Sequence, residues 1–349
     1  MPRLSTHPAR SYALVIATVA LAAPVVSHPA RLSAASRRAV RPADRSAQAP
    51  ATSARVPRND AELTALMKEL SNWGRWGKDD QLGTINLITP DKRKQAAALV
   101  REGVSVSLAR DSERERAEDN GSPYEITMRA AGMDAISVAY HGYAHTHIDA
   151  LWHIAVDDKS YNGVPRSLGF EKGAPALSVL NLKSGIFTRG IVVDIPRLRG
   201  VRYLEPGAAI YPEDLDAWEK KTGVKIGSGD AVFIYTGRWA RRAAVGPWNV
   251  GQQMAGLHAS AARWLKTRDV AMLGHDGGNE MTPTLVEGVG FPLHQLAIVA
   301  MGMPLLDNCD LEAVAEAAAK RGRWDFLLTV APLAIRGGTG SPANPIATF

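Results

Sequence analysis

Three short apolar runs, at residues 190–194, 229–235 and 270–273, most constrain the fold of this chain. Their lack of polar alternation is typical of strands that are buried on both faces of a sheet. We therefore expect these runs to lie side by side in the centre of a domain, with other elements covering them.

The remaining elements follow from hydrophobic periodicity and from capping residues. Further strands are expected at residues 104–108, 124–128, 135–140 and 327–331, the last of these ending the fold. Helices are expected at residues 60–70 with Asn59 or Asp60 as cap, and at residues 91–100, 212–221, 257–267, 293–301 and 311–320. Because strands and helices mix without strict alternation, we predict a single mixed α/β domain with a partly antiparallel sheet.

The N-terminal segment has the features of an export signal. Arg3 and Arg10 precede an apolar run at residues 12–26, and small residues follow, with a cleavage site expected after Ser27. The run is about 15 residues long, short of the ~20 that span a bilayer, although an uncleaved anchor is the alternative. We predict a signal peptide at 1–27, a disordered linker rich in Ala, Arg, Ser and Pro at 28–58, and the folded domain at 59–349. The protein would then be periplasmic or secreted, with no stable membrane insertion after signal removal.

The net charge of +6 does not describe the folded domain. Residues 1–58 hold nine arginines and one acidic residue, which leaves 32 basic and 34 acidic residues in the remainder, a net charge of −2. A basic groove for nucleic acid is therefore not expected. The single cysteine, Cys309, excludes an intramolecular disulfide and a four-cysteine metal site.

Four of the nine histidines lie within 13 residues, together with Asp149: His141, His145, His147 and His153. On an extended chain His147 and Asp149 point to the same side, and imidazole with carboxylate is a ligand set for Zn²⁺ or Mn²⁺. His141 and His145 compete for the third ligand position. His153 could act on an activated water or on the leaving group.

The segment from Thr146 to His153 resembles the Thr-His-x-Asp-x-x-x-His signature of the cyclase-like metal-dependent hydrolases, a family that includes bacterial kynurenine formamidases and isatin hydrolases. The likeness extends over roughly residues 70–335. It includes residues 76–87, 229–237 and 273–276, His294, and the pair Asp307-Asn308.

The resemblance implies metal ligands at His141, His147, Asp149, His294 and Asp307, for one or two Zn or Mn ions. Two departures from the family pattern stand out. Tyr143 occupies the position of the family's first metal His, which makes His141 the preferred equivalent and His145 the second choice. Asp307 stands where two-metal members have Glu.

The resemblance also implies hydrolysis of a carbon–nitrogen bond in a small aryl formamide or cyclic amide, with His153 as general base and acid. Trp76 and Trp152 are candidate substrate-binding residues. A swivelling β/β/α-type fold and a homodimer or higher oligomer are expected on the same ground. Alternatives are lactone hydrolysis or dehydration and ring closure at the same metal, and a secreted protein that binds a metal or ligand without turnover. For His258, near a predicted helix start, capping or solvation is the default expectation.

Overall fold

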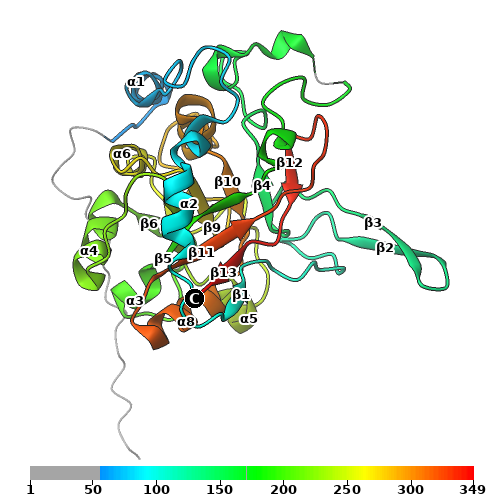
Figure 1. Ribbon diagram of the computed structural model, residues 1–349, viewed down its shortest axis with the longest axis vertical. Coiled ribbons are helices and arrows are strands. Elements are labelled where there is room, and N and C mark those ends of the chain that lie inside the picture. Colours follow the sequence, from blue (N-terminus) through cyan, green and yellow to red (C-terminus); the bar gives the residue numbers. More distant parts are fainter. Residues whose placement is uncertain (1–55, 170) are drawn as a thin grey trace, which may run out of the picture. The chain divides into compact units, whose positions relative to one another are not determined.

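The computed structural model describes residues 56–169 and 171–349 (Figure 1). The predicted signal peptide and nearly all of the predicted linker lie outside these residues. The first described helix, α1 (Asp60–Leu70), begins where the sequence predicts, because the Asn59 side chain accepts a hydrogen bond from the backbone N–H of Glu62.

A nine-stranded mixed sheet forms the centre of the fold (Figure 1). Its parallel middle consists of β5 (Ile186–Asp194), β7 (Ala231–Tyr235), β9 (Met272–His275) and β10 (Leu305–Asp307). On the β5 side the antiparallel strands β11 (Asp325–Val330), β13 (Ile346–Thr348) and β1 (Ser105–Ser107) follow, and on the β10 side β4 (His147–Asp149) and β12 (Gly340–Pro342). The predicted α/β class with a partly antiparallel sheet is confirmed.

Helices cover the sheet, as its buried central strands require. Besides four short 3-10 helices, η2 (Gly83–Leu87), η3 (Tyr161–Gly163), η4 (Arg166–Leu168) and η5 (Val179–Leu182), the other described helices are α2 (Pro90–Ala97), α3 (Ile195–Arg199), α4 (Pro212–Thr222), α5 (Arg238–Val245), α6 (Ala261–Thr267), α7 (Pro292–His294), the π-helix η6 (Gln295–Met301) and α8 (Glu312–Arg321). Helix α2 packs across β5 and β11, and every residue of β7 and β9 is buried. None of the described helices is both long and apolar enough to cross a membrane.

Two expectations at the ends of elements are wrong. The helix expected over residues 257–267 begins only at Ala261, because Gly256 and Leu257 form β8, which pairs in parallel with β6 (Ala209–Ile210). The strand at Asp325–Val330 is not the last, since β12 and β13 follow it. The strands β8, β12 and β13 have only two or three residues each, and their partner strands are distant in the sequence. No local periodicity therefore marks them.

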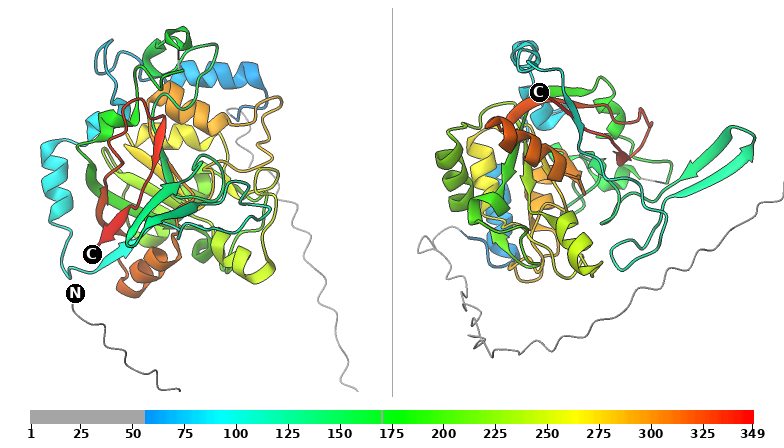
Figure 2. Two further views of the ribbon diagram at one scale, coloured as in Figure 1. Left: turned by 90° about the vertical axis from the view of Figure 1, so that its right-hand side faces the viewer. Right: turned by 90° about the horizontal axis from the view of Figure 1, so that it is seen from below.

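A hairpin of β2 (Glu125–Ala130) and β3 (Met133–Ser137) forms a separate two-stranded sheet. Figure 1 and Figure 2 show it projecting away from the nine-stranded sheet. Three of its apolar side chains, Met128, Met133 and Ile136, are more than half exposed. The chain that leaves β3 leads directly to His141.

Candidate metal centre

Two neighbouring strands bring three predicted ligands to one face of the sheet. β4 carries His147 and Asp149, whose side chains share a face because strand residues alternate. In the antiparallel pairing of β4 with β10, Asp307 lies opposite His147. Residues directly opposite each other project on the same side, so all three polar side chains meet there. The sheet register therefore joins segments that are far apart in the sequence.

The first ligand group consists of His141, His147 and Asp149, whose candidate ligand atoms lie within 4.8 Å of one another. Nδ1 of His141 lies 3.1 Å and Nε2 of His147 lies 3.5 Å from Oδ1 of Asp149. Nδ1 of His147 donates to the carbonyl oxygen of His145 at 2.8 Å. Its proton is therefore on Nδ1, which leaves the lone pair of Nε2 directed at the carboxylate.

The second group consists of Asp149, His294 and Asp307, again with ligand atoms within 4.8 Å. Nε2 of His294 lies 3.7 Å from Oδ2 of Asp149 and 3.6 Å from Oδ2 of Asp307. On the other edge of the ring, Nδ1 of His294 hydrogen-bonds to the buried carboxylate of Glu280. A carboxylate on the far nitrogen is the usual support of a metal-binding His, because it fixes the ring and its tautomer.

The donor set fits divalent cations. Asp149 is 1% exposed, and both of its carboxylate oxygens are buried without a hydrogen-bond partner among the described residues. Burial opposes its ionisation, yet the imidazoles of His147 and His153 hold its pKa below the usual range. An unsatisfied buried carboxylate is costly unless a cation accompanies it. One oxygen faces His141 and His147 and the other faces His294, so Asp149 would be a ligand in both groups when cations are bound.

His153 stands beside both groups without belonging to either. Its ring stacks on that of His141 with centroids 4.2 Å apart, and its Nε2 lies 3.7 Å from Oδ2 of Asp149. Burial lowers the pKa of His153 to about 4, against the attraction of Asp149, so the ring is neutral at pH 7. The side chains of His141 and His153 are 32% and 25% exposed, which makes this stacked pair the open side of the centre.

The loop that carries His141 is held by Asn308, which the resemblance includes in the pair Asp307-Asn308 without a role, and by Arg238, which no motif marks. Asn308 donates from Nδ2 to the carbonyl oxygens of Gly142 and His145, at 2.7 and 3.2 Å. Its Oδ1 accepts a hydrogen bond of 2.6 Å from Arg238, whose guanidinium also donates to the carbonyl of Tyr143. Asn308 directly follows Asp307, a member of the second ligand group. Its hydrogen bonds therefore hold the loop that carries His141 close to Asp307.

Glu280 is the other missed residue of the centre. It is 1% exposed, and one of its oxygens, Oε1, has no hydrogen-bond partner among the described residues. Although burial would lower it, the pKa of His294 lies well above its ordinary value because of the carboxylates of Glu280 and Asp307. Glu280 lies in a loop after β9, at no recognisable spacing from the other acids, so no motif marks it.

Other predicted residues lie outside the two groups. His145, the second choice for first ligand, points elsewhere and contacts the carbonyl oxygen of Ser122 at 2.8 Å. His258 is 1% exposed, which contradicts the solvated alternative; its Nδ1 accepts from the N–H of Ser260 just before α6. Its imidazole therefore takes part in the hydrogen bonding at the start of that helix.

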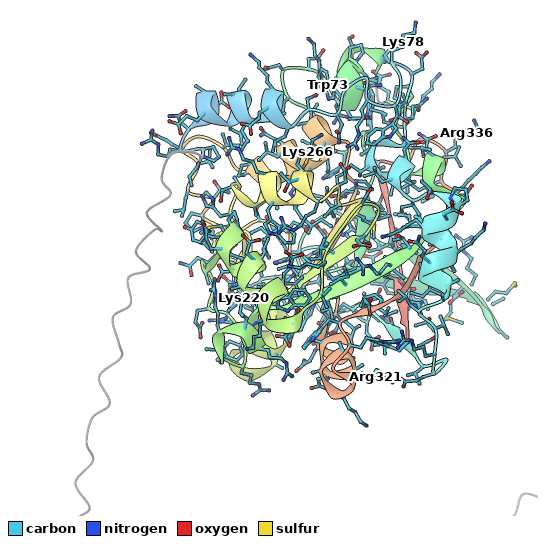
Figure 3. All side chains as sticks on the ribbon, turned by 60° about the vertical axis from the view of Figure 1, so that its left-hand side comes forward. Trp73, Lys78, Lys220, Lys266, Arg321 and Arg336 are labelled. Carbon is cyan, nitrogen blue, oxygen red and sulfur yellow. The ribbon has the colours of Figure 1, made fainter. Side chains whose placement is uncertain are left out.

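The two tryptophans predicted to bind substrate, Trp76 and Trp152, belong to neither ligand group. Trp152 is fully buried in the core with the Arg166 guanidinium over its ring, so it offers no surface to a substrate in this structure. Trp76 is partly exposed and stacks under Arg75. Trp73, at the upper edge of Figure 3, donates from Nε1 to the carbonyl of Val299. The expectation for Trp152 as a substrate-binding residue is thus corrected by its burial.

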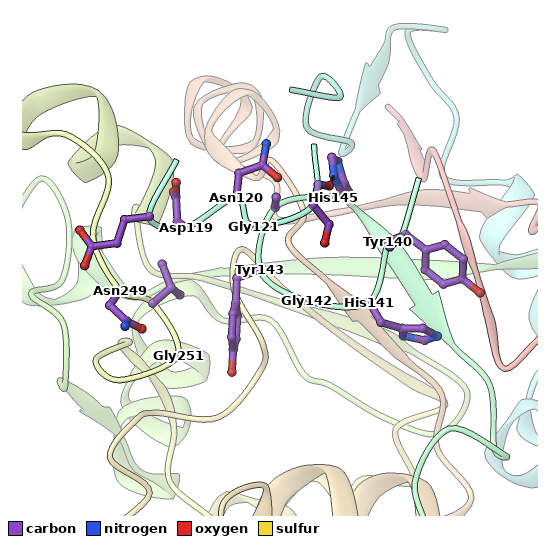
Figure 4. A pocket seen from close by; sticks show the side chains of 15 residues that line it. Asp119, Asn120, Gly121, Tyr140, His141, Gly142, Tyr143, His145, Asn249 and Gly251 are labelled. Atoms are coloured by element: carbon purple, nitrogen blue, oxygen red, sulfur yellow. Dashed lines mark hydrogen bonds between the residues drawn. The ribbon is translucent and has the colours of Figure 1, made fainter. Parts of the chain in front are cut away.

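A cavity of about 220 Å³ lies beside the first group (Figure 4). Three segments line it: residues 118–122, residues 139–145 and residues 249–251. His141 and Tyr143 are the lining residues that also border the ligand groups. The volume is below the ~300–1,000 Å³ of pockets that hold drug-sized ligands, which favours a small molecule.

Comparisons with known proteins give the family of the chain and its likeness in fold to solved structures. The profile of the family described as "Putative cyclase" matches residues 64–279. A crystal structure of a novel cyclase has 30% sequence identity and a TM-score of 0.73, covering 81% of this chain and 99% of that chain. Isatin hydrolase A from Ralstonia solanacearum has 20% identity and a TM-score of 0.51, covering 72% of this chain and 93% of its own, a likeness of fold. No curated protein matches the sequence. Because the family profile matches more than half of the chain, the protein belongs to the family described as "Putative cyclase".

Proposed function

We propose that the protein is a metal-dependent hydrolase that cleaves a carbon–nitrogen bond in a small aromatic or cyclic amide. One observation carries the proposal: Asp149, buried and without a hydrogen-bond partner, lies between two ligand groups, with His153 beside it on the open side. Family membership and the resemblance of residues 146–153 to a hydrolase signature support the same reading. The nitrogen and oxygen donors suit Zn²⁺ or Mn²⁺.

A divalent cation at this centre would supply Lewis-acid polarisation of the amide carbonyl and a lowered pKa for the attacking water. The chain itself supplies proton transfer and orientation. The neutral Nε2 of His153 accepts the proton of the water and passes it to the leaving nitrogen. His141 stacks on His153 and restricts the rotation of its ring, while the buried Asp149 keeps its negative charge for the cations.

A panel of substrates tests this function. Purified protein is loaded with Zn²⁺ or Mn²⁺ and assayed with aryl formamides, cyclic amides and lactones, and with substrates for dehydration. We expect turnover of the amides, lost by at least ~100-fold in His153→Ala with metal content unchanged. His258→Asn, which alters a histidine outside the centre, serves as control. Full activity in His153→Ala removes the general-base role, and stoichiometric binding without turnover favours a binding protein.

The proposal includes a homo-oligomer and an exported protein. A two-stranded hairpin is marginally stable by itself in water, and the one here exposes Met128, Met133 and Ile136. A second copy of the chain is the partner we propose for this apolar face. Light scattering should give at least a dimer, and Ile136→Ser should shift it towards monomer.

Cell fractionation with sequencing of the mature N-terminus tests export and cleavage after Ser27.

A further inference from the structure

We propose that Tyr143 contacts the substrate and donates a hydrogen bond from its phenol hydroxyl to the substrate's carbonyl oxygen. The inference rests on the proposed function, because it assigns a further residue to the same centre. Tyr143 stands four residues before His147, where the resembling family has its first metal-binding His. In this structure His141 completes the first ligand group with His147 and Asp149, and Tyr143 belongs to neither group.

Two glycines provide the space for the ring of Tyr143. A Cβ atom on Gly251 would lie 3.2 Å from Cε2 of the ring, and a Cβ on Gly278 would lie 3.2 Å from Cε1. The same Cβ position on Gly278 lies 3.8 Å from Oδ2 of Asp307. The phenol ring therefore lies between Gly251 and Gly278, and the carboxylate of Asp307 lies close to Gly278.

The phenol of Tyr143 is partly buried near Glu280 and Asp307, the two acids that surround His294. The ordinary pKa of a phenol is about 10, so the hydroxyl carries its proton at neutral pH and can donate a hydrogen bond.

The backbone of Tyr143 is fixed on both sides. Arg238, 3% exposed, donates to the carbonyl of Tyr143 itself, and Asn308 donates to the carbonyls of Gly142 and His145. Because these donors are themselves buried, the loop cannot easily shift. A donor held rigidly in this way requires little reorganisation when charge develops on a substrate oxygen.

Tyr143 also forms one wall of the 220 Å³ cavity, as Figure 4 shows. His141, a member of the first ligand group, lines the same cavity. A small substrate that enters there meets the phenol of Tyr143 on its way to Asp307. The carbonyl oxygen of an amide held at the ligand groups then comes within reach of the hydroxyl.

Tyr143→Phe tests the inference because it removes only the hydroxyl. The matched control is Tyr211→Phe, which changes the N-cap residue of α4, outside the centre. Three quantities are measured on metal-loaded protein: metal content, kcat/KM for the amide that the wild type turns over, and the affinity for benzoate by calorimetry. Benzoate serves as the probe because its carboxylate oxygen stands in for the substrate oxygen. We expect kcat/KM to fall about 100-fold and benzoate to bind roughly tenfold more weakly, with metal content unchanged.

Two results overturn the inference. A loss of metal in Tyr143→Phe would identify the phenol as a ligand rather than a donor to substrate. Equal benzoate affinity in the wild type and Tyr143→Phe, or a wild type that binds no benzoate, contradicts contact with the substrate oxygen. A wild type that turns over no amide counts against the proposed function instead, and the benzoate measurement still decides the role of Tyr143.

Discussion

Nε2 of His294 lies 3.7 Å from Oδ2 of Asp149, although His294 comes from α7 and Asp149 from β4. The other oxygen of the same carboxylate faces His141 and His147. Asp149 thus belongs to both ligand groups, and the two groups differ in the residues that complete them. This arrangement allows the two cation positions to be separated by mutation.

His294→Ala should lower the metal content from two divalent ions per chain to one. The substitution removes a ligand of the second group and leaves His141, His147 and Asp149 in place. Elemental analysis after dialysis measures the content, and Asp307→Ala should give the same result. If both variants retain two ions, the second position is held by other residues.

Asn308→Asp should weaken metal binding by about 10- to 100-fold, the range for substitutions behind metal ligands. The aspartate can still accept from Arg238, but it cannot donate to the carbonyls of Gly142 and His145. The loop with His141 then loses its link to Asp307. Competition with a chelator measures the affinity.

Asn344→Asp is the control for Asn308→Asp, because its Oδ1 only accepts from Ser107 and an aspartate preserves that bond. Equal metal affinity in the two variants would mean that the loop keeps its position without Asn308.

The sequence predicts the position of a residue in this centre only where a local pattern, such as strand alternation, determines it. The spacing of His147 and Asp149 suffices to predict that they share a face, because it follows from strand geometry alone. His294 and Asp307 were expected only through the family resemblance, since the sheet order that brings them to Asp149 is not visible in a local pattern.

Glu280 and Arg238 could not be predicted for the same reason, and Asn308 was expected only as part of the family's pair with Asp307, without its role in holding the loop. Arg238 reaches the loop from the start of α5, and its backbone N–H is fixed by Asp276 at the end of β9. The fold class was predictable because the short runs in β5, β7 and β9 are continuously apolar, without polar alternation. The two-residue strand β8 was not, because its pairing with β6 overrides the helical periodicity that begins at Leu257.

Gly83→Ala should destabilise the fold by at least about 3 kcal/mol, combining overpacking with backbone strain. Gly83 has φ +57°, and a Cβ there would lie 1.9 Å from the carbonyl oxygen of Gly302, so the backbone would have to move. Gly103→Ala is the control: its φ is +70°, but nothing lies within 4 Å of its Cβ position. Its cost should be about 1 kcal/mol. Urea unfolding measures both, and equal costs would contradict the close contact.

Stability should decrease as the pH falls from about 6.5 towards 4, in part because of His258. Burial lowers its pKa to about 4 in the folded protein. In the unfolded chain its pKa is about 6.5, so in this window the unfolded state binds more protons and acid favours it. His258 contributes up to about 3 kcal/mol to this loss.

His258→Asn keeps an acceptor for the N–H of Ser260 but does not titrate. Urea unfolding of both proteins across the window should therefore show a smaller pH dependence in the variant. Identical pH dependence would mean that the imidazole is accessible to solvent in the folded state.

The metal content of the wild type and of Asp149→Asn, measured by elemental analysis, tests the central claim most directly. The substitution preserves the shape of the side chain but removes the charge that both ligand groups share. We predict two divalent ions per chain in the wild type, and a loss of bound metal together with hydrolysis in the variant. Metal content that is unchanged in Asp149→Asn, or absent from the wild type after loading with Zn²⁺ and Mn²⁺, would contradict the account.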